Sequence, residues 1–570
     1  MRDRLRYFIQ IQQESIRPKL FTVLKEGITK EQWRKEIISG AIVGVVALPL
    51  AIAFAIASGV TPDKGLVTAV IAGFIISALG GSRVVIGGPT GAFIPIVYGI
   101  VQLYGVDGLV ISTFMAGILL VIMGLARLGS IIKFIPHSLV VGFTTGIAVI
   151  IFSTQMRDFF GLRIQSVPAA FHEKWIVYVQ NAGLWNPWAT ALALGTVVLV
   201  FIFPRVTTKI PGALIAILLF TAIAKYFQLP VETIESRFGD IPSSLPSPIV
   251  PHLDWATIQN LIRPALAIAL LGAIESLLCC VVADSMIGAS HRSNTELVAQ
   301  GVANIASSFF GGIPATGAIA RTATNIKNGG RTPIAGITHA LVLLMIMLFF
   351  GRWAKWIPLS VLAGVMIYVA YNMSEWRTFK ALARGQRSDV AILLTTFFLT
   401  VVFDLTVAIE VGVILSAFLF MRRMAEISDI RQVTEQMVDH EDGDDPDSMQ
   451  YYPIPREVQV FEINGPLFFG VAHKFKEAMR RVAKAPKVMI LRMRLVPTID
   501  ETGLHHLREF IQNLHDRKVK VILSGVSPQL MEELQDGHVL EIAGEKNVFS
   551  HISGAVARAK ELVAGLETSA

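Results

Sequence analysis

The sequence predicts an α-helical integral membrane protein of fourteen segments, built as a seven-plus-seven inverted repeat and followed by a small cytoplasmic α/β domain. Three observations predict this class. The chain of 570 residues is 53% hydrophobic but only 16% charged, with a mean hydropathy of +0.58, whereas soluble domains average about 25% charged residues. Its apolar residues are concentrated between about 37 and 421. Beyond them, strand-like and helix-like patterns alternate.

The first 36 residues form a basic, amphipathic segment. Its nine Lys and Arg residues are Arg2, Arg4, Arg6, Arg17, Lys19, Lys25, Lys30, Arg34 and Lys35. No short apolar core with a small-residue cleavage site opens the chain, so we do not expect a signal peptide. The first apolar run follows at 37–62, long enough for the ~20 residues that a bilayer requires. Basic residues before a first span place the N-terminus in the cytoplasm.

Two series of apolar runs make up the predicted transmembrane domain, 37–424. The runs of the first series are 37–62, 65–82, 84–106, 108–126, 134–156, 175–204 and 210–224. Those of the second are about 264–284, 297–320, 332–351, 356–374, 390–403 and 405–421. The run at 297–320 is long enough for a helix, a break and a half-helix, so each series supplies seven segments. We therefore expect repeats at about 37–228 and 264–424.

An internal echo supports this duplication. The third segment of the first half opens with Gly-Gly-Pro-Thr-Gly-Ala at 87–92, and its counterpart contains Gly-Gly-Ile-Pro-Ala-Thr-Gly-Ala at 311–318. Because seven is odd, the second copy would be inverted across the membrane. The even total returns the C-terminus to the cytoplasm, in agreement with Arg422 and Arg423 after the last span.

The composition changes after residue 424. The predicted linker, 425–455, has seven acids and no Lys or Arg between 435 and 447, which is typical of a solvated segment. In the expected domain at 456–565, strand patterns at 458–463, 487–496 and 519–523 alternate with helical patterns at 501–514 and 528–534. This alternation predicts a small parallel sheet covered by helices.

The two Gly-Pro clusters predict an anion site inside the membrane. Non-helical backbone at membrane depth is tolerated only where protein buries it or a cavity hydrates it. Each cluster should be followed by a half-helix whose free N–H groups attract an anion. Arg321 follows the second cluster among apolar residues, where a cation is costly unless it faces a polar cavity. The alternative is that Gly and Pro only permit tight helix packing.

Glu275 is the second ionisable residue inside an apolar run. Its neighbours at 270–278 include Leu, Ile and Ala, and such surroundings favour the neutral, protonated carboxyl. A group that gains and loses a proton is the minimum requirement for proton coupling. Sodium binding is the rival role, although Cys279 one turn further on is a poor ligand for a hard cation. A static ion pair with Arg321 is the third interpretation.

Several classes of protein are disfavoured by the sequence. The only two cysteines, Cys279 and Cys280, are adjacent and lie in an apolar run, so we expect no disulfide, metal site or cofactor. The net charge of +7 and the isoelectric point near 9.3 are explained by basic residues beside the spans, and we expect no nucleic-acid partner. No Walker loop and no catalytic constellation is present, so we expect a secondary transporter and not an enzyme.

Several motifs resemble the sulfate permease (SulP) family of anion transporters, which carries a C-terminal STAS domain. The matching segments are 46–55 (VALPLAIAFA), 87–90 (GGPT), 272–278 (GAIESLL), 294–304 and 311–325 (GGIPATGAIARTATN). The likeness spans about 30–560 and looks closest to the C4-dicarboxylate transporters of the family.

The resemblance implies a core and a gate domain, a homodimer, and an elevator-like movement of the anion. It also implies which residues line the substrate site, with Glu275 coupling transport to protons. These substrate-binding positions are Leu50, Phe54, Gly88, Thr90, Gly91, Ala320 and Arg321. Relatives with Gln at the position of Leu50, or Phe at that of Thr90, would have a different pocket.

Regulation is expected in the STAS domain. Thr502, in the sequence Asp500-Glu501-Thr502-Gly503, matches a phosphorylated position in related soluble regulators; the alternative is that Asp500 simply caps a helix. A cytoplasmic protein could bind this domain.

We therefore expect an inner-membrane, proton-coupled transporter of sulfate or a C4-dicarboxylate, with a small anion, protons and the lipid bilayer as its partners. The alternatives are a transporter of bicarbonate or another inorganic anion, an uncoupled anion channel on the same scaffold, and a membrane signalling protein whose working part is the STAS domain.

Overall fold

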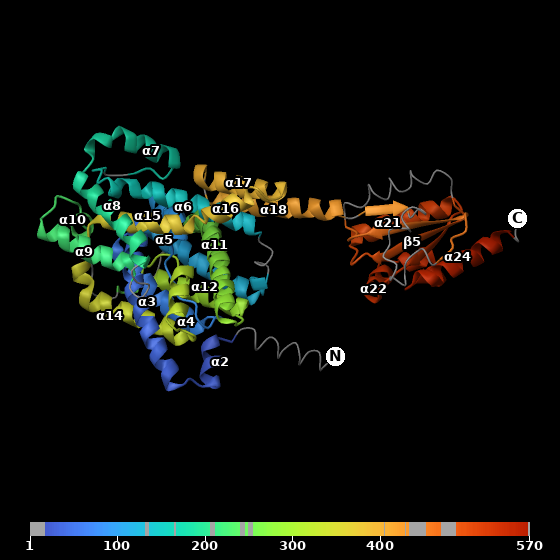
Figure 1. The fold of residues 1–570 in the computed structure, drawn as a ribbon, viewed down its shortest axis with the longest axis horizontal. Coiled ribbons are helices and arrows are strands. Elements are labelled where there is room, and N and C mark those ends of the chain that lie inside the picture. The colour runs from blue at the N-terminus through green and yellow to red at the C-terminus, as the bar shows by residue number, and fades with distance from the viewer. Residues whose placement is uncertain are drawn as a thin grey trace. The chain divides into compact units, whose positions relative to one another are not determined.

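The structure is a computed structural model of the chain. It describes residues 17–130, 136–164, 167–205, 211–239, 246–248, 255–403, 405–427, 429–432, 452–468 and 486–567. Two compact units are present, Met1–Ser416 and Ala417–Ala570. The first is helical and the second contains a five-stranded sheet (Figure 1).

The first half of the helical unit contains the segments predicted at 37–224. Its elements are α2 (Lys19–Glu26), α3 (Lys30–Ala57), α4 (Pro62–Leu79), β1 (Gly87–Gly88), η1 (Gly91–Phe93), α5 (Ile94–Leu125), α6 (His137–Phe159), α7 (Phe171–Gln180), η3 (Ala182–Leu184), α8 (Pro187–Ile202), η4 (Phe203–Arg205), α9 (Gly212–Tyr226) and α10 (Ile234–Phe238). Non-helical Gly105 divides α5 into two helical parts, the third and fourth predicted segments.

The prediction of one span at 175–204 was wrong in its first part. The chain forms the separate short helix α7 and only then α8. Asn186 starts α8 because its side chain accepts hydrogen bonds from Trp188 N and Ala189 N, at 3.0 and 3.3 Å. Pro187 then occupies the first helical turn, where its missing N–H costs nothing.

The second half repeats the pattern. Its elements are α11 (Trp255–Ile287), α12 (Ser293–Phe309), β2 (Thr316–Gly317), α13 (Ile319–Lys327), α14 (Pro333–Ala354), α15 (Leu359–Met373), α16 (Trp376–Leu382), α17 (Arg387–Val402) and α18 (Leu405–Ile427). The run at 297–320 forms a helix, a break and the start of a half-helix, as the sequence predicted.

Length and composition support a membrane location. Among the described residues, six helices are apolar and long enough to cross a bilayer. They are Lys30–Ala57, Pro62–Leu79, Gly91–Leu125, His137–Phe159, Pro187–Arg205 and Thr257–Ile287. Two shorter apolar helices are Gly212–Tyr226 and Pro333–Phe349.

The helices pack in two bundles, each of which mixes the two halves. In the core bundle, α3 and α4 pack on α14, and α5 packs on α11 and α12. In the gate bundle, α6 packs on α15 and α17, and α8 on α9 and α15. Figure 1 shows α6, α8, α15 and α17 together in its upper part, and α3, α4, α12 and α14 below them. Glycine permits the close α5–α12 contact, because a Cβ on Gly301 would lie 2.6 Å from the carbonyl oxygen of Gly117.

Hydrogen bonds between loops define two faces of the helical unit. On the N-terminal face, Lys19 N donates to Gly80 O and Arg292 N to Gly81 O, which joins α2 to the turns after α4 and α11. On the distal face, Asn186 N donates to Phe160 O, which joins the start of α8 to the turn after α6, and Glu235 N donates to Lys355 O, which joins α10 to the turn after α14.

The second unit is a sheet of order β3-β4-β5-β6-β7 in which β3 is antiparallel to β4 and the other pairs are parallel. Its elements are β3 (Asp429–Gln432), β4 (Val458–Asn464), β5 (Val488–Leu495), α21 (Glu501–Asp516), β6 (Lys520–Ser524), α22 (Pro528–Asp536), α23 (Val539–Ala543), η7 (Glu545–Asn547), β7 (Val548–Phe549) and α24 (Ile552–Glu567). Side chains of α21, α22 and α23 pack on one face of the sheet and those of α24 on the other. Residues 433–451, most of the predicted acidic linker, lie outside the described residues.

Candidate anion site between the broken helices

The two broken segments meet in a short antiparallel ribbon. Gly87 pairs with Gly317 and Gly88 with Thr316. Ala318 N extends the pairing by donating to Ile86 O at 2.9 Å. The clusters that echo each other in the sequence therefore contact each other, and each leads at once into a helical segment.

Both helical starts leave backbone N–H groups available. The N-cap residues are Thr90 for η1, which continues into α5, and Ala318 for α13, and neither side chain caps its helix. First-turn N–H groups have no partner within their own helix and carry a partial positive charge. Ala320, in the first turn of α13, is exposed. These two starts are thus suited to bind an anion.

Arg321 of α13 lies against the ribbon, next to Gly88. Its side chain is 2% exposed; Nη2 donates to the carbonyl oxygen of Pro89, and Nη1 has no hydrogen-bond partner in the described part of the chain. The ribbon needs glycine here, because Gly88 has a φ of +147° and a Cβ on it would lie 2.6 Å from Arg321 Nη1. A buried guanidinium nitrogen without a partner favours an anion beside it.

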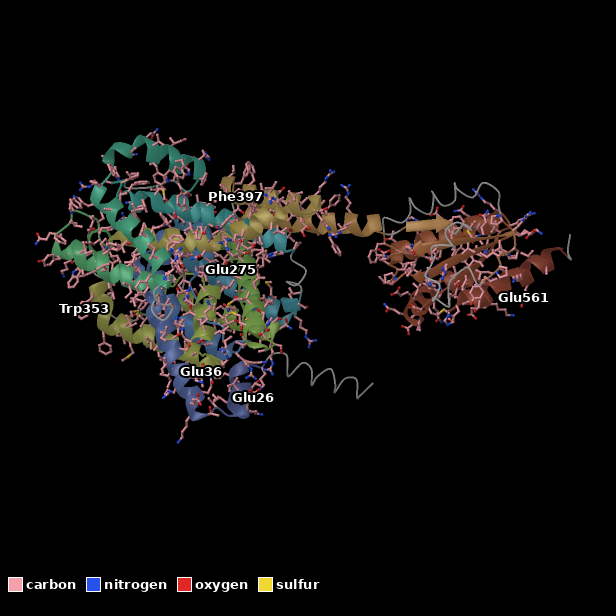
Figure 2. All side chains as sticks on the ribbon, in the orientation of Figure 1. Glu26, Glu36, Glu275, Trp353, Phe397 and Glu561 are labelled. Atoms are coloured by element: carbon pink, nitrogen blue, oxygen red, sulfur yellow. The ribbon has the colours of Figure 1, made fainter. Side chains whose placement is uncertain are left out.

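Glu275 reaches the same place from α11. Its carboxylate Oε2 accepts a hydrogen bond from Thr90 Oγ1 at 3.0 Å, and the side chain is half-buried. Figure 2 shows Glu275 within the body of the helical unit. The structure records no ion pair between Glu275 and Arg321. The static ion pair, one of the three interpretations that the sequence left open for Glu275, is therefore not formed.

Polar side chains that the sequence analysis did not assign to the site fix the ribbon to α11. Ser276 Oγ lies 2.6 Å from Thr316 Oγ1, and Thr316 Oγ1 donates to Gly272 O at 3.1 Å. On the other side, Thr322 Oγ1 accepts from Ile86 N at 3.0 Å. In the sequence, Thr316 lies within the second Gly cluster, Ser276 follows Glu275 and Thr322 follows Arg321, and these positions are their only signal.

The gate bundle closes the site opposite the ribbon. A Cβ on Gly91 would lie 3.5 Å from Phe54 Cε1, 3.4 Å from Ile151 Cδ1 and 3.2 Å from Met373 Sδ. Ile151 and Met373 belong to α6 and α15, so core and gate meet at Gly91. Neither residue was predictable from the sequence, because apolar side chains on gate helices carry no distinguishing pattern.

The expected substrate positions are thus only partly linked by contacts. Phe54, Gly88, Thr90, Gly91, Glu275 and Arg321 surround the ribbon and the start of η1. Leu50 is half-buried on α3, one turn before Phe54, and Ala320 lies at the start of α13. Their link to the other six is through the chain itself, because Leu50 is one helical turn from Phe54 and Ala320 is bonded to Arg321.

The regulatory candidate in the second unit, Thr502, follows the residue that caps α21. Asp500 Oδ1 accepts a hydrogen bond from Gly503 N at 2.7 Å and caps α21, and Thr502 is exposed in the first turn. Further along α21, ligand atoms of His505, His506 and Glu509 lie within 4.8 Å of one another. This group of potential metal ligands was not predicted from the sequence.

The fold and the site define a membrane transporter in which paired broken helices face a common binding place. Comparison with known proteins identifies the family. Residues 33–396 match the sulfate permease family and residues 452–555 the STAS domain. The chain belongs to the sulfate permease family, and the resemblance drawn from its motifs is confirmed.

Similar proteins extend over nearly the whole chain. A putative sulfate transporter, YvdB of Bacillus subtilis, is 42% identical over 529 residues, which cover 92% of this chain and 98% of the relative. The bicarbonate transporter BicA of Picosynechococcus is 31% identical over 525 residues, which cover 88% and 90% of the two chains.

Solved structures agree with the fold. The transmembrane domain of a cyanobacterial BicA has a TM-score of 0.62 at 32% identity and covers 67% of this chain and 98% of that one. Murine Slc26a9 has a TM-score of 0.85 at 19% identity, covering 96% and 94%; it supports the fold alone. The chain is a multi-pass membrane anion transporter of this family, with a STAS domain, and not an enzyme.

Proposed function

We propose that this protein is a secondary active transporter that binds one small anion at the ribbon and couples its passage to a proton on Glu275. The observation that carries the proposal is the convergence of three groups on one place: the Thr90–Glu275 hydrogen bond, the unpartnered Nη1 of Arg321, and two uncapped helical starts. The core bundle would carry the anion past the gate bundle in an elevator-like movement, which alternates access between the two faces.

Proton coupling follows from the charges around the site. A carboxylate beside an arriving anion is repelled by it, and protonation of Glu275 removes that repulsion. Sodium is less suited, because Cys279 is buried one turn from Glu275 and its thiol is within 3.3 Å of Thr322 Oγ1. The neutral carboxyl would still hydrogen-bond to Thr90. Each anion would therefore enter with at least one proton.

The proposed substrate is an oxyanion of the sulfate type or a C4-dicarboxylate, and the alternative is bicarbonate. Relatives named as sulfate and bicarbonate transporters support the oxyanion class. Each of these anions has negatively charged oxygens that can accept hydrogen bonds from a guanidinium and from helix N–H groups. The small apolar wall formed by Leu50, Phe54 and Met373 would select among them by size.

We place the N-terminal face in the cytoplasm and the protein in the inner membrane. Basic residues gather on that face, among them Lys25, Arg83, Arg292, Lys327 and Arg331, as expected for cytoplasmic loops. Six helices in the described part of the chain are long and apolar enough to cross a bilayer, which supports multi-pass insertion. Homodimerisation, and a cytoplasmic protein partner for the STAS domain, complete the proposal.

Thr502 would be the point of regulation. Its exposed hydroxyl in the first turn of α21 is accessible to a kinase, and a phosphate there would interact favourably with the helix N-terminus. It would also change the charge beside Asp500, which caps the same helix.

The test is flux into proteoliposomes that contain the purified full chain. Sulfate, bicarbonate and succinate are each supplied on one side, with and without an inward proton gradient, at two pH values. A coupled carrier accumulates one of these anions only when the gradient is present. Flux that persists without the gradient and follows voltage would instead identify a channel. Transport that is retained after deletion of residues 430–570 would argue against the STAS-based signalling alternative.

A further inference from the structure

A cavity lies between the core and gate bundles, on the distal side of the ribbon. Its volume is about 500 Å³, and it is lined by residues of α5, α6, α7, α11, α17 and α18. It begins at Ile94 and Pro95, one helical turn after Gly91, and extends along α5 to Tyr104. It therefore follows the path that an anion would take between the distal face and the ribbon.

Lys174 lines this cavity from the short helix α7. Its side chain is only 1% exposed, and its ammonium lies 5.6 Å from the ring centre of Tyr98. Within the described residues, Nζ makes no hydrogen bond and no ion pair. Burying an ammonium without a counter-charge is costly, and that burial lowers the pKa of Lys174 to about 8. The folded protein therefore keeps one energetically costly, unpaired ammonium in the wall of the cavity.

The rest of the wall contains few charges. Arg263 and Glu410, both exposed, are the other charged lining residues, and Thr154, Asn260 and Thr400 are uncharged polar ones. Most other lining side chains are apolar. Apolar walls strengthen the attraction between an ammonium and an anion, because they lower the local dielectric constant.

We propose that this cavity is an entrance site in which the ammonium of Lys174 binds the transported small oxyanion or carboxylate before it passes Ile94 to the ribbon. The inference rests on the proposed function and adds a second site for the same class of anion. An acyl chain is the competing occupant, since the walls are apolar. An acyl chain, however, gives the buried ammonium no partner, whereas an anion does.

The position of Lys174 is held firmly. Tyr98 Oη donates to Val167 O at 2.5 Å, which ties α5 of the core to the segment before α7. A Cβ on Gly59, in the turn between α3 and α4, would lie 3.2 Å from Tyr98 Cδ2. Tyr98 is thus at the distal end of the core, and Lys174 is the gate-side residue that faces it. The proposed entrance site therefore uses both bundles and would change as they move.

The experiment measures the concentration dependence of transport from each face separately. Right-side-out and inside-out membrane vesicles containing the full chain are compared for the wild type, Lys174→Met and Lys174→Arg. The matched control is Lys225→Met, an exposed cation of α9 that does not line the cavity. We expect Lys174→Met to raise the KM for anion supplied at the distal face about tenfold, the loss typical of one charge-assisted hydrogen bond. The KM from the N-terminal face, and both values for Lys225→Met, should stay unchanged.

A pH profile separates binding from packing. Because the anion binds the charged ammonium, the distal KM of the wild type should rise as the pH passes from 7 to 9, and that of Lys174→Arg should not. The other titratable or charged groups that face the cavity or pack around α7 are Tyr98 and Tyr104 from α5, Arg157 and Asp158 from α6, Tyr178 from α7 itself, Arg263 from α11 and Glu410 from α18. All of them, and Glu275, are the same in the wild type and in Lys174→Arg, so the difference between the two profiles isolates Lys174.

The outcomes distinguish this inference from the proposed function. Lys174→Met with an unchanged distal KM, or with KM raised equally from both faces, would overturn the entrance site while leaving the transporter intact. Inhibition of the wild type and Lys174→Met alike by dodecanol, with no change in KM, would assign the cavity to acyl chains and also overturn it. If the wild type moves none of the anions, the proposed function itself fails. A melting temperature of Lys174→Met at or above that of the wild type would show that the variant folds.

Discussion

The hydroxyl of Thr90 donates a hydrogen bond to the carboxylate of Glu275 at 3.0 Å and so joins two residues that are 185 positions apart. Thr90 lies at the first broken segment and Glu275 on the helix that opens the second half. Arg321, across the ribbon, points a nitrogen without a partner at Gly88. One cation, one carboxyl and two helical starts thus meet in an otherwise apolar bundle.

Removing the guanidinium should abolish tight anion binding. We expect Arg321→Ala to lower the transport rate at limiting anion on the order of 100-fold, because charge-assisted hydrogen bonds contribute about 1.5–3 kcal/mol each. Initial uptake into proteoliposomes measures the effect. Lys327→Ala, which removes an exposed cation from the same helix, is the control and should transport normally. Equal activity of both variants would place Arg321 outside the site.

Neutralising Glu275 should uncouple transport from protons. In Glu275→Gln the side chain can still bond to Thr90, so the anion should exchange across the membrane but no longer accumulate against its gradient. Below pH 7, where Lys174 stays charged, wild-type uptake should increase as the pH falls, since protonation of Glu275 admits the anion, and uptake by the variant should be independent of pH. Glu31→Gln, at an exposed carboxylate of α3, controls for the loss of one acid. A pH dependence below pH 7 that survives in Glu275→Gln would reject the coupling role.

The ribbon should tolerate no side chain at position 88. Gly88→Ala would combine an unfavourable φ of +147° with a contact of 2.6 Å to Arg321 Nη1, and such strain costs about 1–3 kcal/mol. We expect a lower melting temperature together with loss of transport. Gly183→Ala is the comparison, because nothing lies within 4 Å of a Cβ there. A fully active Gly88→Ala protein would mean that the ribbon geometry is not required.

The cap of α21 should stabilise the STAS domain. Asp500→Ala removes the hydrogen bond from Gly503 N and should destabilise this domain by about 1 kcal/mol. Hydrogen exchange of the first-turn amides in the full chain measures it locally. Gln512→Ala, an exposed position on the same helix, should leave those amides protected. If the two variants exchange alike, Asp500 does not act as a cap.

The sequence predicted most of the fold because lipid imposes a strong pattern on it. Long runs without charge mark the spans, and the paired Gly-Pro clusters mark the two breaks that the structure places in one ribbon. The prediction was wrong at 175–204, since hydropathy alone cannot separate α7 from α8; Asn186 and Pro187 were the available signal. It did not anticipate that α11 begins at Trp255, before the apolar run.

The site was predictable as a set of residues but not as a set of contacts. Arg321 and Glu275 stand out because an ionisable side chain in an apolar run is costly. Their partners were not deducible, because the bond to Thr90 depends on how two halves pack. Lys174 gave no signal at all, since a lysine next to a span ordinarily faces water, and only the packing of α7 buries it.

The proposed mechanism requires the transported anion to lie at the start of α13, beside the ribbon. Ala320→Cys tests it directly, because position 320 is exposed in the first turn while Cys279 and Cys280 are fully buried. The rate at which a small water-soluble thiol reagent modifies this cysteine is measured against the concentration of each anion. We predict that the transported anion slows modification with a half-maximal concentration equal to its KM. A rate that no anion alters, in protein that still transports, would mean that the anion binds elsewhere.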